Sequence, residues 1–316
     1  MTNQDFEALS MIARIEFPLN HFCKHYSSLL YHYTSRKGLE GILASDKPSL
    51  WFSQYDYLND PTERLDIEIF LKEYCERKLE EGEFSKEFAE MVMSIRGQDE
   101  CYVVWQNDVD NFNVGDTKEC YTYICSFSED YDSLPMWNYY TKSENQDGYN
   151  IMFKPYSFRE ETGHRNGFKL ELNKVIYDDK TKTELADKML LDFSKSYDNA
   201  PLDTKESIRI VLQWLVNKFQ FVFKNAAYEY EKEVRAILRV PKDFTEDSFI
   251  SKRKERKIGN YSIPYVSFNV PEFKHLTITT SPTIQQVDVD LYEKIKNAGY
   301  KDVRFINSAI PFRNMF

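Results

Sequence analysis

Glycine is scarce in this sequence, and none of the glycine-rich nucleotide-binding motifs occurs. Only 10 of the 316 residues are Gly, and neither a P-loop nor a G-x-G-x-x-G fingerprint is present. Such loops use glycine so that backbone amides can approach a phosphate closely. The G-x-S-x-G turn that carries the nucleophile of α/β-hydrolases is also missing. Phosphate binding by a glycine-rich loop and a hydrolase serine are therefore not expected.

Cysteine is sparse as well, and its spacing indicates neither a zinc site nor a disulfide framework. His21 and His25 have the i, i+4 spacing of a helical metal pair, but no third ligand accompanies them. We expect no bound metal and a reducing compartment. A cysteine–histidine nucleophile pair stays open, because nothing in the spacing selects one. The five cysteines contain no C-x-x-C and are scattered at Cys23, Cys75, Cys101, Cys120 and Cys125.

Excess positive charge and long apolar runs are also lacking. The chain has 41 basic and 51 acidic residues, a formal net charge of −10, which argues against a general nucleic-acid binder. No run of about 18 apolar residues is present, so no membrane span is expected. Residues 1–10 are polar and acidic, unlike a signal peptide. A cytoplasmic protein without membrane contact is expected.

The sequence does contain ample core-forming residues: 42% are hydrophobic and 16% aromatic. Helical periodicity predicts a lead-in over 1–29, insertions over 61–97 and 181–224, and a last helix ending before Gly299. Residues 97–119 and 251–260 lack apolar periodicity and are expected to be loops. These patterns predict a single α+β domain over 1–316, with a central, mostly antiparallel sheet. Strands are predicted near 30–33, 49–53, 121–128, 149–154, 168–177, 228–238, 265–270, 276–280 and 303–306, with 149–154 paired to 168–177.

Several helix ends carry recognisable signals. Thr34 or Ser35 can cap the helix that follows the first strand, and Ser85 precedes another helical pattern. Capping boxes are predicted at Asp60-Pro61-Thr62-Glu63 and at Asp203…Glu206.

The most unusual strand prediction is Tyr228–Leu238. On a strand, Glu229, Glu231, Glu233 and Arg235 share one face, although Glu is disfavoured in strands. One interpretation is a solvated edge strand with Arg235 partly neutralising the carboxylates. The other is a functional carboxylate pair with a basic neighbour, able to stabilise positive charge in a substrate.

Two further segments can contribute chemistry. His32 stands between two tyrosines on the first strand, either as a hydrogen-bonded structural group or as a site residue. In 121–128, alternation puts Tyr121, Tyr123, Cys125 and Phe127 on one face and Thr122, Ile124, Ser126 and Ser128 on the other. The basic residues of 252–257 suit an exposed loop, or docking to an acidic polymer.

Ordered motifs resemble a widespread bacterial domain-of-unknown-function family, number 2971. They are L-Y-H-Y-T-S at 30–35, G-I-L at 41–43, L-W-F-S at 50–53, L-N-D-P-T-E at 58–63, C-S-F-S-E at 125–129, M-W at 136–137, Y-E-Y-E-K-E-V-R at 228–235, Y-K-D-V at 300–303 and S-A-I-P-F-R at 308–313. They span nearly the whole chain, but this family implies no particular activity.

A second resemblance is to ADP-ribosyltransferases. Their site uses an early strand bearing His or Arg, a middle strand bearing Ser-x-Ser or an aromatic residue, and a late strand bearing Glu. This chain has His32, then Ser126-Phe127-Ser128, then Glu231-Lys232-Glu233. The E-x-E is similar to the arginine-modifying branch and the Tyr-His-Tyr-Thr to the His-type branch, so features of two branches are mixed.

The resemblance implies NAD as a substrate that loses nicotinamide through an oxocarbenium-like state, without a metal. Glu233 then stabilises the ribose charge, Glu231 orients or deprotonates the acceptor, and His32 hydrogen-bonds the ribose. Support for Glu233 or the sugar comes from Ser126 or Ser128, with Arg235 beside the carboxylates. Tyr33 or Trp51 stacks on the nicotinamide.

The leading hypothesis is thus an ADP-ribosyltransferase-like enzyme, a bacterial toxin or phage-defence effector that modifies a protein or nucleic-acid acceptor. The alternative is a non-enzymatic module that binds a nucleotide or protein through the same cleft. A third hypothesis is a magnesium-dependent nuclease using Glu229, Glu231 and Asp60.

Overall fold

The computed structural model describes residues 11, 29–58, 65–98, 100–106, 112–141, 147–158, 168–271 and 275–311. The predicted lead-in over 1–29, apart from residues 11 and 29, lies outside these ranges, as does the predicted capping box at Asp60–Glu63.

The chain forms two compact units. One comprises Met1–Lys24, Asn59–Glu100 and Lys174–Glu229, and the other His25–Leu58, Cys101–Asn173 and Tyr230–Phe316. Both predicted helical insertions fall within the first, helical unit. The single domain over 1–316 stays a prediction, because compactness alone does not define what folds independently.

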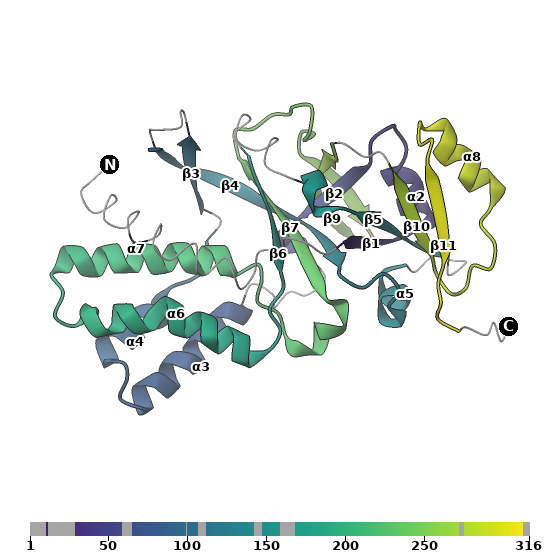
Figure 1. The fold of residues 1–316 in the computed structure, drawn as a ribbon. Coiled ribbons are helices and arrows are strands. Elements are labelled where there is room, and N and C mark those ends of the chain that lie inside the picture. The colour runs from purple at the N-terminus through teal and green to yellow at the C-terminus, as the bar shows by residue number, and fades with distance from the viewer. Residues whose placement is uncertain are drawn as a thin grey trace. The chain divides into compact units, whose positions relative to one another are not determined.

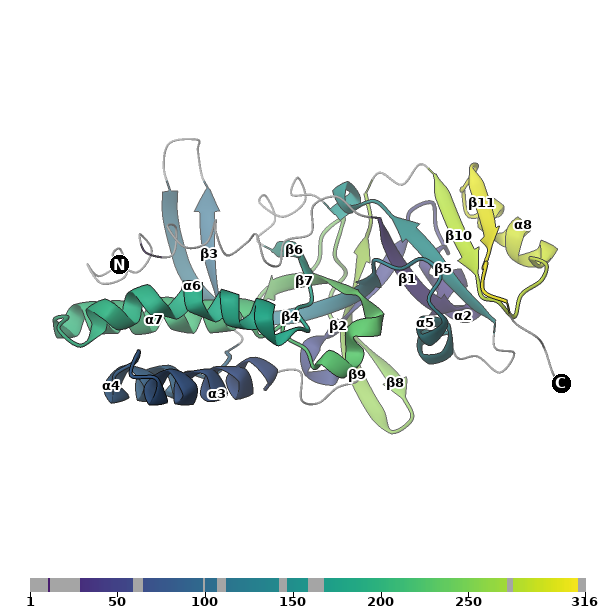
Figure 2. The same cartoon turned by 60° about the horizontal axis from the view of Figure 1, so that its bottom comes forward.

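The helical unit is built from long amphipathic helices, of which α6 and α7 run antiparallel, side by side (Figures 1 and 2). Ser85 caps α4 as predicted, since its Oγ accepts a 3.1 Å hydrogen bond from the Phe88 amide. The capping box predicted at Asp203 is wrong: α7 follows Pro201 without a side-chain cap, and Glu206 pairs with Arg209 instead. The helices of this unit are α3 (Asp66–Glu80), α4 (Lys86–Ser94), α6 (Asp179–Tyr197) and α7 (Leu202–Phe219).

The second unit contains an 11-stranded sheet, in which β10 and β11 pair in parallel and the other strand pairs of described register are antiparallel. The α+β class and the mostly antiparallel sheet are therefore confirmed; its ADP-ribosyltransferase-like character stays a prediction. The strands are β1 (Leu30–Ser35), β2 (Ser49–Gln54), β3 (Glu100–Gln106), β4 (Phe112–Ser128), β5 (Gly148–Phe153), β6 (Lys169–Lys174), β7 (Glu233–Pro241), β8 (Lys254–Ile258), β9 (Tyr261–Asn269), β10 (Leu276–Thr280) and β11 (Val303–Asn307). The short helices are α2 (Arg36–Ile42), α5 (Leu134–Tyr140) and α8 (Val289–Asn297), with 3-10 turns η1 (Tyr55–Tyr57), η2 (Pro155–Phe158) and η3 (Ala226–Glu231).

The strand order corrects three predictions. The sheet runs β11-β10-β5-β1-β4-β2-β9-β8, with β3 and β7 also paired to β4, and β6 to β7. β5 therefore pairs with β1 and β10, not with β6 as expected. The loop predicted over 97–119 contains β3 and the first part of β4, and that over 251–260 contains β8. β8 is rich in charged residues, and its pairing with β9 rather than apolar alternation determines it.

The two faces of β4 differ as the alternation predicts. Tyr123, Cys125 and Phe127 are buried in the main core, which also contains residues of α2 and α8, such as Leu39 and Leu291. The opposite face carries a smaller cluster of Tyr33, Met136 and Trp137, the last two from α5. Helices thus cover both faces of this part of the sheet.

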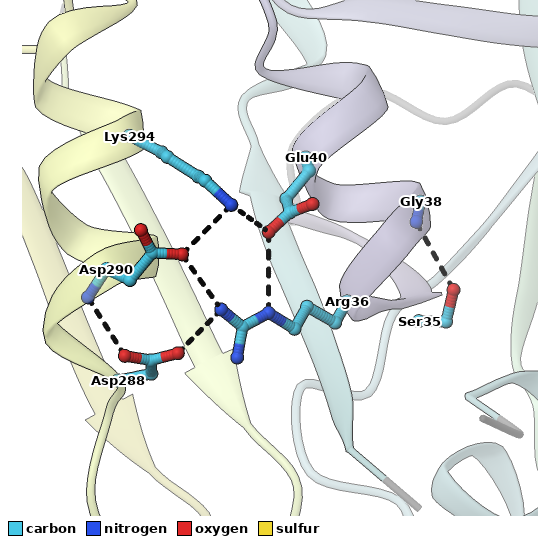
Figure 3. Close-up of polar contacts among 7 residues, drawn as sticks. All are labelled: Ser35, Arg36, Gly38, Glu40, Asp288, Asp290 and Lys294. Carbon is cyan, nitrogen blue, oxygen red and sulfur yellow. Dashed lines mark hydrogen bonds and ion pairs between the residues drawn. The ribbon is translucent and has the colours of Figure 1, made fainter. Parts of the chain in front are cut away.

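Polar contacts join the starts of α2 and α8 (Figure 3). The Arg36 guanidinium lies 2.6 Å from an Asp288 carboxylate oxygen and 3.4 Å from Glu40. Lys294 lies 2.9 Å from Asp290 and extends the network. Ser35 caps α2, as expected, by accepting from the Gly38 amide at 3.2 Å. The hydrogen bond from Arg36 holds the pKa of Asp288 below its ordinary value.

Candidate functional site

β4 brings the three motif-bearing strands together. One of its edges pairs with β7 over Cys120–Ser128. The other edge is shared: β1 pairs at Ser128, and β2 pairs at Tyr123 and Ile124. The strands that carry His32, Ser126 and Glu233 are therefore neighbours in the order β1-β4-β7.

The register determines which side chains share a face. Ser128 lies opposite Glu233 and Ser126 opposite Arg235, and directly paired residues project to the same side of a sheet. Tyr31 is paired with Ser128 and lies on that side as well. His32, one residue along β1, projects to the opposite side. The structure thus groups Ser126, Ser128, Glu233 and Arg235, without the His32 ring.

His32 occupies the fork where β1 and β2 separate along β4. Its Nδ1 lies 3.0 Å from the Ser126 carbonyl oxygen, and its ring centroid is 5.6 Å from that of Phe127. A carbonyl only accepts, so Nδ1 carries the hydrogen and Nε2 has the lone pair. Burial lowers the pKa of His32, opposed by the bond to Ser126. A neutral imidazole follows at neutral pH.

Cys125 lies beside the same histidine, its Sγ 3.9 Å from His32 Nδ1. Burial raises the pKa of this thiol, although Arg256 opposes the shift. Thiolate, not thiol, is the nucleophile, and Nδ1 already faces a carbonyl. The geometry therefore does not make the open cysteine–histidine pair an activated nucleophile.

The E-x-E segment is not on a continuous strand, which corrects the prediction for 228–238. η3 ends at Glu231, β7 begins at Glu233, and Lys232 between them has a positive φ of 42°. Glu229 is exposed on η3, so it does not share a face with the others. The solvated-edge interpretation is also wrong, because β7 lies between β4 and β6.

Glu233 and Arg235 form a buried ion pair. Arg235 donates from Nε to Glu233 Oε1 at 2.9 Å and from Nη2 to Oε2 at 3.0 Å. Their exposed fractions are 5% and 1%. A bidentate pair of this kind consists of two charge-assisted hydrogen bonds and fixes the orientation of the carboxylate.

Glu231 is held separately at the entrance to β7. The Tyr140 hydroxyl donates to Glu231 Oε1 at 2.6 Å, and Ser128 Oγ donates to the Glu231 carbonyl at 2.7 Å. Ser128 Oγ also accepts from the Asp130 amide at 3.0 Å. Ser128, predicted to support the carboxylates, therefore binds the backbone of one of them.

Tyr33 belongs to a structural cluster beside this turn. Its hydroxyl donates to the Asp130 carbonyl at 2.8 Å and accepts from the Ser133 amide at 3.0 Å. Its ring meets Trp137 edge-on, with centroids 4.6 Å apart. Burial raises the pKa of Tyr33. Through these contacts, Tyr33 holds the segment that follows β4 in place.

Asp132 is a connecting residue that the sequence reasoning missed. Its carboxylate accepts from Trp137 Nε1 at 2.9 Å, from Ser308 Oγ at 2.6 Å and from the Ala309 amide at 2.7 Å. It thereby links the M-W and S-A-I-P-F-R motifs. Tyr140 was also missed; its place one helical turn after Trp137 was the available signal.

Trp51 lies apart from the carboxylates, on β2. It is 46% exposed and contacts Tyr265, with ring centroids 4.6 Å apart. It projects to the same side of the sheet as Ser53, and hence as Ser126, because Ser53 pairs with Ile124.

Three further features bear on function. Within the described ranges, no group of three or more His, Cys, Asp or Glu side chains is arranged to hold a metal ion. No helix in the described part is both long and apolar enough to cross a membrane. Cys120 is disulfide-bonded, a bond that the spacing of the cysteines did not indicate, while Cys75 and Cys125 are free.

The fold and the site together define an α+β protein with a mostly antiparallel sheet. The sheet forks at β4, which pairs with β7, the strand that carries the buried Glu233–Arg235 ion pair. Residues 136–236 match the family model described as "Protein of unknown function (DUF2971)". This match confirms the family prediction, and it covers the segment from Met136 through the E-x-E and Arg235. No curated protein and no solved structure matches the chain.

Proposed function

We propose that this protein is an ADP-ribosyltransferase-like enzyme that uses NAD. The observation that carries the proposal is that β1, β4 and β7 are neighbours in the sheet. These strands bear the His, the Ser-x-Ser and the Glu of the ADP-ribosyltransferase resemblance, in that order. The register places Ser126, Ser128 and Glu233 on one face of these neighbouring strands, where one small substrate could meet them. A toxin or phage-defence effector in the bacterial cytoplasm, with a protein or nucleic-acid acceptor, is the context that we propose.

The carboxylates have distinct roles in this proposal. Arg235 holds the Glu233 carboxylate in a fixed orientation, from which its negative charge can stabilise the oxocarbenium charge of the ribose. Glu231, oriented by Tyr140, acts on the acceptor. The geometry favours His32 as a positioning residue, because its Nδ1 joins β1 to the β4 backbone. Ser126, exposed on the Glu233 face, is available to the sugar.

Nicotinamide release from NAD tests the proposal. Purified wild type is compared with Glu233→Gln and Glu231→Gln, in EDTA, with and without cell lysate. We expect metal-independent release, reduced by about a hundredfold or more in Glu233→Gln, the scale of losing one preorganised electrostatic contact. Glu229→Gln is the matched control, because Glu229 is exposed on the same turn, and it should retain full activity.

Glu233→Gln also leaves Arg235 without its full counter-charge, so each variant needs a melting curve. Tyr140→Phe offers a milder change that removes only the hydroxyl on Glu231. Folded wild type that releases no nicotinamide under any condition would overturn the enzyme proposal.

A binding module is the second candidate, favoured by the Glu233–Arg235 pair. Such a pair neutralises its own charge inside the sheet, as a purely structural group does. In that case Glu233 variants change stability and no turnover exists to lose. The nuclease hypothesis predicts instead an activity that EDTA abolishes; its Asp60 lies outside the described residues.

A further inference from the structure

A second polar site lies on the β2-β9-β8 branch of the sheet. Ser53 pairs with Tyr265 and Trp51 with Ser267, so these four side chains project to one side. Arg256 on β8 pairs with Ile263 and projects to the same side. Its side chain reaches across β9: Nη2 donates to Ser53 Oγ at 2.9 Å, and the guanidinium carbon lies 5.5 Å from the Trp51 ring centroid.

Arg256 has no acidic partner among the described residues. Its described contacts are Ser53, which is neutral, and the Trp51 ring. Its Nε–H is buried and has no hydrogen-bond partner in the described part of the chain. Burial lowers the pKa of the guanidinium from its ordinary value, a sign of charge that the protein itself does not compensate. An anion supplied from outside would satisfy both the charge and the donor.

The surroundings favour an anion. Lys254 projects to the same side of β8, being paired with Tyr265. The one carboxylate of this strand, Glu255, projects to the other side, where Ser262 donates to it at 2.7 Å. The site is thus locally positive in a chain of net charge −10.

The aromatic group beside Arg256 indicates what the anion is attached to. Trp51 already contacts Tyr265 and Arg256, yet 46% of it remains exposed. An exposed indole next to a guanidinium suits a planar base joined to a phosphate. One recessed arginine suits a single nucleotide better than a polynucleotide, which requires a basic track.

We propose that Arg256, held by Ser53 and Trp51, binds the phosphate of a nucleotide whose base lies against the exposed part of Trp51. The proposal concerns binding and holds whether or not NAD chemistry occurs. Ser53 lies opposite Ile124, two residues before Ser126 on the same face, or about 7 Å along β4. A dinucleotide held here would extend towards Ser126 and Ser128.

Calorimetric titration with ADP and with adenosine tests the phosphate contact. We expect ADP to bind wild type, and adenosine to bind at least about tenfold more weakly, the scale of losing charge-assisted hydrogen bonds. Arg256→Gln should weaken ADP binding by a similar factor and leave adenosine unchanged. Lys257→Gln is the matched control, because Lys257 is exposed and projects to the opposite side of β8; its ADP affinity should equal that of wild type.

Several results would overturn the proposal: no ADP binding by wild type, equal affinity for ADP and adenosine, or unchanged ADP affinity in Arg256→Gln. A dT12 oligonucleotide that binds more tightly than ADP, with an affinity that Arg256→Gln does not change, would assign the face to nucleic acid instead.

Melting curves establish that each variant folds. If Arg256→Gln does not, Arg256→Lys decides, because it keeps the charge but removes the donor fork, and it should still lose most of the ADP affinity. ADP binding without nicotinamide release would uphold this site and refute the proposed enzyme.

Discussion

At the scale of single residues, His32 is kept neutral by its position in the fork of the sheet. Burial lowers its pKa, while the Ser126 carbonyl stabilises the hydrogen on Nδ1. The neutral ring leaves Nε2 as an acceptor, and the described residues supply no donor to it. His32 thus behaves as a hydrogen-bonded connector of two strands.

This environment predicts a pH dependence of stability. In the unfolded chain a histidine titrates near pH 6.5, and His32 in the folded protein titrates lower. Between these two values the unfolded state binds more protons, so the free energy of unfolding falls as pH falls below about 6.5. Urea unfolding at pH 7.5 and pH 5.5 should show a larger loss for wild type than for His32→Asn, which keeps a donor towards Ser126. An NMR titration of the His32 ring with a midpoint above the ordinary value would contradict this account.

At the scale of elements, the connection into β7 is fixed by β4. Lys232 has a left-handed backbone conformation that residues other than Gly rarely adopt. Hydrogen bonds on either side hold it: Ser128 Oγ to the Glu231 carbonyl at 2.7 Å, and the Glu129 amide to the Lys232 carbonyl at 3.0 Å. The strained residue lets Glu231 and Glu233 both become buried within one short turn.

Two serines on β4 allow a matched test of this connection. Ser128→Ala should lower the free energy of unfolding by about 1–3 kcal/mol, because it leaves the Glu231 carbonyl and the Asp130 amide without their shared partner. Ser126→Ala, on the same face but exposed, should change it by at most about 0.5 kcal/mol. Chemical denaturation with both variants measures the difference. Equal effects would show that the hydroxyl of Ser128 does not hold the turn.

At the scale of the whole molecule, the units are built from segments distant in sequence. The family match over 136–236 contains β5, β6 and only the start of β7, as far as Ala236, but neither β1 nor β4. β5 pairs with β1 and β10, and β7 with β4. The matched segment therefore carries only part of the sheet that it helps to form.

A fragment of residues 136–236 is accordingly expected not to fold alone. It would expose the β7 edge that β4 covers and both edges of β5, leaving backbone groups unpaired. Urea titration followed by circular dichroism should show no cooperative transition, in contrast to the full chain. A cooperative transition with protected β7 amides in hydrogen exchange would contradict this expectation.

Local signals were sufficient for much of the fold. Alternation in 121–128 predicted which side chains of β4 share the face of the main core, and Ser35 and Ser85 cap their helices as expected. β8 was taken for a loop, because its charged residues have no apolar alternation and only pairing with β9 makes it a strand. The family prediction used short motifs, and motif similarity can be recognised from the sequence without knowledge of the structure.

Sequence patterns were enough to predict the α+β class, and they contain the order of the three motif strands along the chain and the residue types that these strands carry. Long-range strand pairing, visible only in the folded protein, makes these strands neighbours and places the His32 ring on the opposite face from Glu233. The physical reason is register: shifting a strand by one residue exchanges its two faces, and register depends on pairing between residues far apart in sequence. The buried Glu233–Arg235 pair and the unpartnered Arg256 were beyond local reasoning for the same reason, because burial and partner choice exist only once distant strands have met.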